Sequence, residues 1–112
     1  MPFYHFSQNN SGGAFDLTDK LTHHVIVEAE SAERANDKLE SLGGYFDGCE
    51  SDRDCPCCGD RWYPAWSSEG CAEPMVYDTK PQDHGKGNNR MLWMEPGKNV
   101  VVHYADGRVE WF

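Results

Sequence analysis

The chain has 112 residues and a formal net charge of −9, with 38% hydrophobic and 12% aromatic residues. This length favours one domain (residues 1–112), in which a modest hydrophobic core leaves room for a metal ion to add stability. The negative charge argues against direct contact with nucleic acid, because binding to phosphates needs a basic surface. The aliphatic runs at 25–27 and 100–102 are too short to span a bilayer, so we expect no transmembrane segment. The first residues resemble no secretion signal, so we expect no secretion.

Strand and helix patterns follow one another through the first half of the chain. Residues 3–7 favour a strand because they are rich in aromatic side chains, and residues 22–29 alternate between apolar and polar positions. Residues 31–42 predict a helix, because Ser31 can cap its first turn and two glycines follow its last one. Weaker strands are predicted at residues 14–18, 61–66, 74–77 and 91–94.

The C-terminal segment predicts a β-hairpin. The dipeptide Asp-Gly at 106–107 lies between two apolar runs and is typical of a two-residue type I′ turn. Such a turn pairs Tyr104 with Val109 and Val102 with Trp111. We therefore expect Trp111 to be buried on the same face of the sheet as Val102.

Cysteines cluster in the middle of the chain. Four of the five lie within residues 49–58, and the centre of this segment reads Cys-Pro-Cys-Cys-Gly. Two thiolates three residues apart on a tight turn can bind one ion, and no helical pattern follows that would suit a redox dithiol. We therefore predict a structural zinc (Zn) site with the ligands Cys49, Cys55, Cys58 and Cys57, and with Cys71 or a histidine as alternatives for the fourth position.

Together these patterns predict the α+β class: a small, mainly antiparallel sheet with one principal helix and a zinc-knuckle loop. Residues 28–54 hold nine acidic residues against three basic ones, a net charge of −6 within a total of −9. Such a surface either keeps the protein soluble or meets a basic partner. On the second interpretation, the partner-binding residues are four acids on one stripe of the predicted helix and three in the next loop: Glu30, Glu33, Asp37, Glu40, Glu50, Asp52 and Asp54.

The aromatic segment after the cysteines admits two interpretations. Trp62, Tyr63 and Trp66 beside Arg61 can form the hydrophobic backing of a metal loop, which is the interpretation we favour, or can stack on nucleic acid bases. No motif in the sequence indicates a particular enzymatic reaction, and we assign no catalytic residue. A closed thiolate site also lacks the open coordination position that a catalytic zinc needs.

Two motifs carry a resemblance to a known family. Residues 4–13 read YHFSQNNSGG and residues 55–62 read CPCCGDRW. With these motifs the chain resembles a family of small, mostly uncharacterised proteins of tailed bacteriophages, over about residues 3–77. The resemblance implies expression in the cytoplasm of the bacterial host, outside the virion, and a function exerted by binding a host protein.

The resulting hypothesis is a zinc-stabilised accessory protein that modulates or inhibits a host protein, such as a defence or transcription component. Its acidic surface would meet a basic surface on that host protein. One alternative is a zinc-knuckle module that binds nucleic acid, which would need a basic patch. The other is a small metal-dependent hydrolase, which would need an open metal position near a carboxylate.

Overall fold

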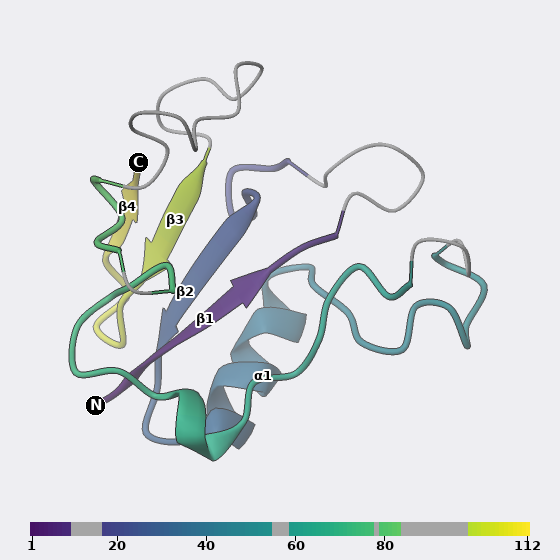
Figure 1. Cartoon of the computed structure of the whole chain (residues 1–112), viewed down its shortest axis with the longest axis horizontal. Helices are drawn as coiled ribbons and strands as arrows, with labels where there is room; N and C mark the ends of the chain where they lie inside the picture. Colours follow the sequence, from purple (N-terminus) through teal and green to yellow (C-terminus); the bar gives the residue numbers. More distant parts are fainter. Residues whose placement is uncertain (10–16, 55–58, 78, 84–98) are drawn as a thin grey trace.

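The computed structural model describes residues 1–9, 17–54, 59–77, 79–83 and 99–112. It confirms the α+β class, with four strands in one sheet and one α-helix (Figure 1). The expected strand at 91–94 and most of the one at 14–18 lie outside the described residues. The elements in chain order are β1 (Phe3–Ser7), β2 (His24–Glu28), α1 (Ala32–Ser41), the 3-10 helix η2 (Ser67–Glu69), β3 (Val100–His103) and β4 (Val109–Trp111).

The sheet is mixed, with the strand order β1-β2-β3-β4. The two outer pairs, β1 with β2 and β3 with β4, are antiparallel as expected. The central pair, β2 with β3, is parallel. A parallel pair needs a crossover connection, and here α1 and the residues after it return the chain to the end of the sheet where β2 began. Strands β1 and β4 form the two edges of the sheet.

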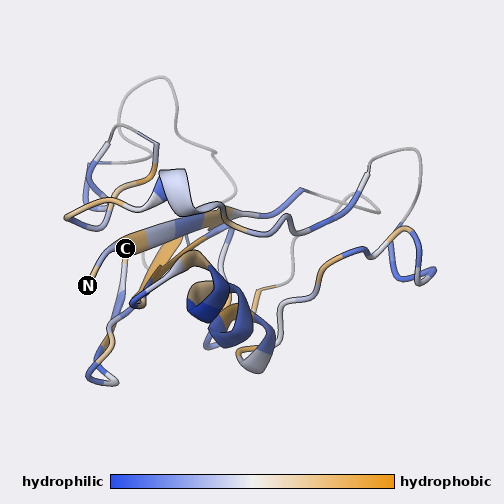
Figure 2. Ribbon diagram, turned by 90° about the horizontal axis from the view of Figure 1, so that it is seen from below, coloured by the Kyte–Doolittle hydropathy of each residue, from blue (hydrophilic) through white to orange (hydrophobic). Residues whose placement is uncertain are grey.

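Both faces of the sheet are covered. Val25 and Val27 of β2 pack in one cluster with Leu39 of α1, and Figure 2 shows this helix lying along one face. Ile26 points to the other face and packs with Val102. Because β2 is buried on both sides, an unbroken apolar run lies at its centre, which is typical of an interior strand.

Helix α1 begins and ends almost where its sequence predicts. The Ser31 side chain caps the first turn by accepting a hydrogen bond from the backbone N–H of Arg34 at 3.2 Å. Gly43 follows the helix with φ of +111°, a conformation that glycine adopts without strain. Ala32, Ala35 and Leu39 form the buried face of the helix. In the described part of the chain, no helix is long and apolar enough to cross a membrane.

The C-terminal hairpin is present, but its predicted register is wrong by one residue. Val101 pairs with Trp111, because the loop holds three residues and the backbone N–H of Tyr104 donates to Arg108 O at 2.9 Å. Gly107 has φ of +93°, which fits a type I turn followed by a left-handed glycine. A shift of one residue exchanges the two faces of a strand. Phe112 therefore joins the second core cluster, while Trp111 is 50% exposed.

Two further predicted strands are wrong. Residues 61–66 form no strand, and the backbone of Ala65 is instead bonded by the side chain of Asn36, which donates to its O and accepts from its N–H at 3.2 and 2.7 Å. Residues 74–77 contribute only an isolated bridge between Val76 and Thr79. The contact between the Asn36 side chain and the Ala65 backbone takes the place of strand pairing, and such a contact leaves no periodic signal in the sequence.

The register of the hairpin generates a prediction about two tryptophans. Trp62→Ala should lower the free energy of unfolding by about 3–5 kcal/mol, because the Trp62 side chain is fully buried. Trp111→Ala should lower it by only about 1 kcal/mol, because half of the Trp111 side chain is already exposed to solvent. Urea denaturation of both variants measures the difference. Equal losses of unfolding free energy in the two variants would contradict the observed register and support the two-residue turn.

Candidate functional site

The two ends of the cysteine segment 55–58 are held close to Cys49. On one side, the backbone N–H of Asp54 donates to Gly48 O at 3.0 Å. On the other, the Asp60 carboxylate accepts a hydrogen bond from the backbone N–H of Cys49 at 3.0 Å. The chain therefore leaves and re-enters the described structure beside the same two residues, Gly48 and Cys49.

A buried carboxylate organises this region. Asp54 is 5% exposed, and its two oxygens accept hydrogen bonds from the Tyr45 hydroxyl at 2.6 Å and the Arg61 backbone N–H at 2.8 Å. The Arg61 guanidinium lies 3.8 Å from the same carboxylate. Burial and the hydrogen bond to Asp54 both raise the pKa of Tyr45, so its hydroxyl stays protonated as a donor. A Cβ at Gly48 would lie 1.8 Å from an Asp54 oxygen, so this position requires glycine.

Arg61 connects this region to the end of β1. Its guanidinium donates to the side-chain oxygen of Gln8 at 3.2 Å, and its backbone O accepts from the N–H of Asn9 at 2.8 Å. The Asn9 side chain also donates to Asp60 O at 2.9 Å. Gln8 and Asn9 belong to the N-terminal motif to which sequence analysis assigned no chemistry. Their role here is to fix the chain that follows the cysteines.

Of the predicted metal ligands, only Cys49 lies within the described residues. Cys49 is partly buried, whereas Cys55, Cys57 and Cys58 fall in the segment left out of the description. Among the residues that are described, no group of three or more His, Cys, Asp or Glu side chains is placed to hold a metal.

The structure separates Cys71, one alternative fourth ligand, from the cysteine segment. The backbone of Cys71 is hydrogen-bonded to the backbone of Phe3 at the start of β1. The residues that follow the cysteine segment are hydrogen-bonded to Asn9, beyond the end of the same strand. Six residues of extended chain separate Phe3 from Asn9, roughly 20 Å at about 3.3 Å per residue. Cys71 therefore belongs to another part of the surface.

The predicted partner-binding acids divide into two groups. Asp54 is buried and its carboxylate is engaged inside the protein, so the expectation that it forms part of an exposed surface is wrong. Its burial follows from its ion pair with Arg61, which the spacing along the chain does not show. The remaining six acids are exposed, and we call them the acidic surface: Glu30, Glu33, Asp37, Glu40, Glu50 and Asp52.

Helix α1 separates acidic from basic side chains on its two flanks. Lys38 lies on the flank towards the hairpin, where its ammonium donates to Tyr104 O at 3.1 Å. Asn36 lies on the other flank, where it holds Ala65. Glu33 and Glu40 are the neighbours of Asn36 at i−3 and i+4, so they share its side of the helix. Glu33 and Glu40 thus lie on the flank of α1 that faces the aromatic segment 62–66.

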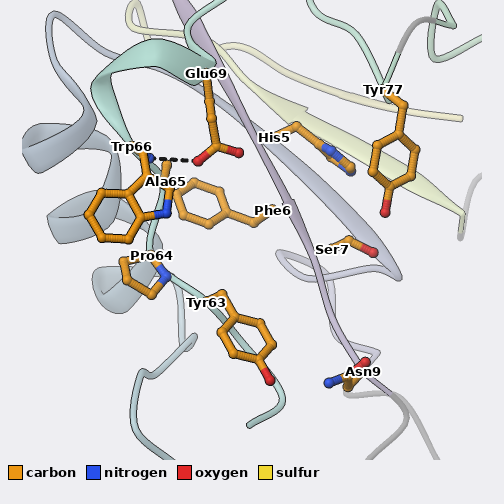
Figure 3. A pocket seen from close by; sticks show the side chains of 10 residues that line it. All are labelled: His5, Phe6, Ser7, Asn9, Tyr63, Pro64, Ala65, Trp66, Glu69 and Tyr77. Atoms are coloured by element: carbon orange, nitrogen blue, oxygen red, sulfur yellow. Dashed lines mark hydrogen bonds between the residues drawn. The ribbon is translucent and has the colours of Figure 1, made fainter. Parts of the chain in front are cut away.

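A groove of about 350 Å³ lies between β1 and the residues that follow Trp62 (Figure 3). One wall comes from β1, including His5 and Ser7, and the other comes from the segment that ends in η2. The backbone N–H of Trp66 donates to the Glu69 carboxylate at 2.7 Å, which holds this second wall in shape.

Sequence analysis missed this groove because it treated the aromatic segment as one unit. Trp62 is fully buried, as expected for hydrophobic backing, but Tyr63 and Trp66 are 55% and 69% exposed. Tyr77, at 68% exposed, also lines the groove. Pro64 between the aromatics, which cannot donate to a strand ladder, is the one available signal that the segment leaves the sheet.

The whole chain, residues 1–112, matches the model of a family described as a domain of unknown function (DUF7296), and the chain therefore belongs to this family. No curated protein and no solved structure matches it significantly. The family thus places the chain among relatives without assigning a reaction or a ligand to the residues described above.

The buried carboxylate generates a prediction about stability. Asp54→Ala should lower the free energy of unfolding by about 3–5 kcal/mol, because it leaves the Arg61 guanidinium buried without its ion-pair partner. Glu50→Ala, in the same loop but exposed, should change the stability by no more than about 0.5 kcal/mol. Thermal or urea denaturation compares the two. A small loss for Asp54→Ala would show that the carboxylate does not organise the loop.

Proposed function

We propose that this member of the DUF7296 family is a zinc-stabilised binding protein that docks on a basic surface of another protein. The arrangement of charge on α1 carries the proposal. Glu33, Asp37 and Glu40 are exposed, whereas Lys38 is directed to the opposite flank and bonded to the hairpin. The carboxylates on this flank are thus little neutralised by basic side chains of the same helix, and they can pair with a partner protein.

The remaining charges on this side support the same conclusion. The exposed pair between Arg34 and Glu30 is 4.0 Å long, with about 70% of both side chains accessible to solvent, so it neutralises little. The net charge of −9 adds a long-range attraction for a basic partner. Attraction of this kind accelerates association and weakens as salt screens it.

The proposed zinc site rests on the cysteine spacing together with the closed frame around it. Two hydrogen bonds, from Asp54 N–H to Gly48 O and from Cys49 N–H to the Asp60 carboxylate, bring both ends of segment 55–58 to Gly48 and Cys49. A thiolate at Cys49 would thus lie next to the segment that carries Cys55 and Cys58, and Cys57 remains a fourth candidate. Zinc would stabilise a domain whose sheet is small.

The proposed biological context follows from the resemblance to tailed-bacteriophage proteins. In this proposal the protein acts in the cytoplasm of the bacterial host and modulates or inhibits a host protein, such as a defence or transcription component. A compact acidic protein can occlude a basic, nucleic-acid-binding surface by occupying it in place of the phosphates. This mechanism needs no catalytic group.

The zinc proposal is tested by metal content. Purified under reducing conditions, the protein should contain about one zinc per chain, and Cys49→Ser should lower both the zinc content and the melting temperature. Cys71→Ser serves as the control and should leave both unchanged, because Cys71 lies at the far end of β1. A wild-type protein that melts cooperatively without zinc would contradict the proposal.

The docking proposal is tested by charge reversal. Asp37→Lys with Glu40→Lys should abolish capture of the partner from a host lysate, while the matched pair Asp19→Lys with Glu73→Lys should preserve it. All four positions are exposed, and each pair changes the net charge by the same four units from −9. Once mass spectrometry identifies the partner, the association rate of the purified proteins should fall steeply with salt for the wild type and for the control pair. Equal capture by both pairs would exclude the acidic surface.

A further inference from the structure

The groove beside β1 lies along an outer edge of the sheet. Hydrogen bonds from Ala29 N–H to Pro2 O at 3.1 Å and from Gln8 N–H to His23 O at 3.0 Å mark the register of the β1–β2 ladder. In an antiparallel ladder alternate residues face the partner strand, so the backbone of Ser7 faces away from β2. That direction is the side on which the groove lies.

The segment that forms the other wall is attached to this edge at both ends. The backbones of Cys71 and Phe3 exchange two hydrogen bonds, of 2.7 and 2.9 Å, at one end of β1. At the other end, the N–H of Asn9 donates to Arg61 O. Between these two attachments the segment bends away from β1 and is held instead by Asn36 of α1. The bend leaves a groove of about 350 Å³ along the strand edge.

The side chains around the groove favour a cationic, planar group. Trp66, Tyr63 and Tyr77 expose their rings, and the Tyr77 ring is packed edge-on against His5 with the centroids 4.8 Å apart. Among the described residues that line the groove, Glu69 is the one carboxylate and there is no Lys or Arg. A guanidinium can stack on an aromatic ring and pair with a carboxylate at the same time, which an ammonium does less well.

We propose that this groove binds an extended, arginine-containing segment of the partner protein. The main chain of that segment pairs with the outward-facing backbone of Ser7 at the edge of β1, and the arginine lies against Trp66 beside Glu69. Addition of a strand to a sheet edge gives affinity through the main chain, and the side-chain contacts give specificity. The inference rests on the proposed function, because it names the part of the basic partner that is recognised. Glu33 and Glu40, which share the flank of α1 that holds Ala65, add negative charge on that side of the aromatic segment.

The experiment is a titration of the isotope-labelled full-length protein, followed by NMR, with the peptide acetyl-Thr-Val-Arg-Val-Thr-amide. Binding should shift the backbone amide of Ser7 and the indole N–H of Trp66. The same peptide with citrulline in place of arginine keeps the shape but loses the charge, and it should bind at least about ten-fold more weakly. Equal binding of the two peptides, or no shift of the Trp66 signal, would overturn the proposal.

Matched variants locate the site. Trp66→Ala and Glu69→Gln should each weaken peptide binding by about five-fold or more, since one removes the ring and the other removes the charge while keeping an oxygen for the Trp66 N–H. Trp111→Ala and Glu73→Gln make the same changes at positions outside the groove and should bind as the wild type does. Loss of binding in the control variants as well would overturn the proposal.

Two other occupants give distinct results, each of which would overturn the proposal. A second copy of the chain would broaden the Ser7 and Trp66 signals on concentration, with a dimer mass in sedimentation. A single-stranded ten-nucleotide thymidine oligomer that binds as tightly as the peptide would show a site for nucleic acid bases.

Failure of the two proposals can be told apart. If the peptide binds at Trp66 but Asp37→Lys with Glu40→Lys does not change partner capture, the acidic-surface proposal is wrong and the groove proposal stands. If capture depends on these acids but the peptide does not shift the NMR signals of Ser7 and Trp66, the groove proposal is wrong and the acidic-surface proposal stands.

Discussion

The buried ion pair between Asp54 and Arg61 is the interaction on which the non-sheet half of the described structure depends. Neither charge can be buried without the other, because the transfer of an unpaired ion from water costs several kcal/mol. The pair therefore forces residues 45–54 and 59–61 to fold against each other. Through Gln8 and Asn9 the same arginine attaches this loop to the end of β1.

This attachment has consequences in both directions along the chain. Towards the cysteines, it brings the ends of segment 55–58 beside Cys49, so that a metal would bind to a loop that protein contacts already close. Towards the aromatics, it sets the start of the segment that crosses from Arg61 to Cys71. That segment has a fixed beginning and a fixed end on β1, and its contact with Asn36 draws its middle towards α1. The groove is the space that results.

A common physical logic links the acidic surface and the groove. A strand edge is a risk for aggregation, and natural proteins protect it with charge, with short length or with a covering segment. Here a covering segment approaches the edge of β1 but leaves part of it lined with aromatic rings and a carboxylate. The net charge of −9 adds mutual repulsion between copies of the chain, which is a further protection of this edge.

The sequence by itself determined the elements whose signals are local. The aromatic strand β1, the apolar strand β2 and the capped helix α1 follow from neighbouring residues, since capping and periodic burial involve positions at most four apart. The exposure of the acids on α1 follows from the same period. The cysteine motif predicts a metal site from spacing alone, and that remains a prediction.

Only the tertiary structure decided the features that depend on contacts between distant residues. The burial of Asp54 comes from Arg61 and Tyr45, and the exposure of Tyr63 and Trp66 comes from the attachment of Ala65 to Asn36. Neither contact leaves a periodic trace. The hairpin register was decided by one additional loop residue, which packs Phe112 rather than Trp111 against the second core cluster. Asp-Gly fits turns of two and of three residues, so the local turn signal does not decide which of the two faces the core.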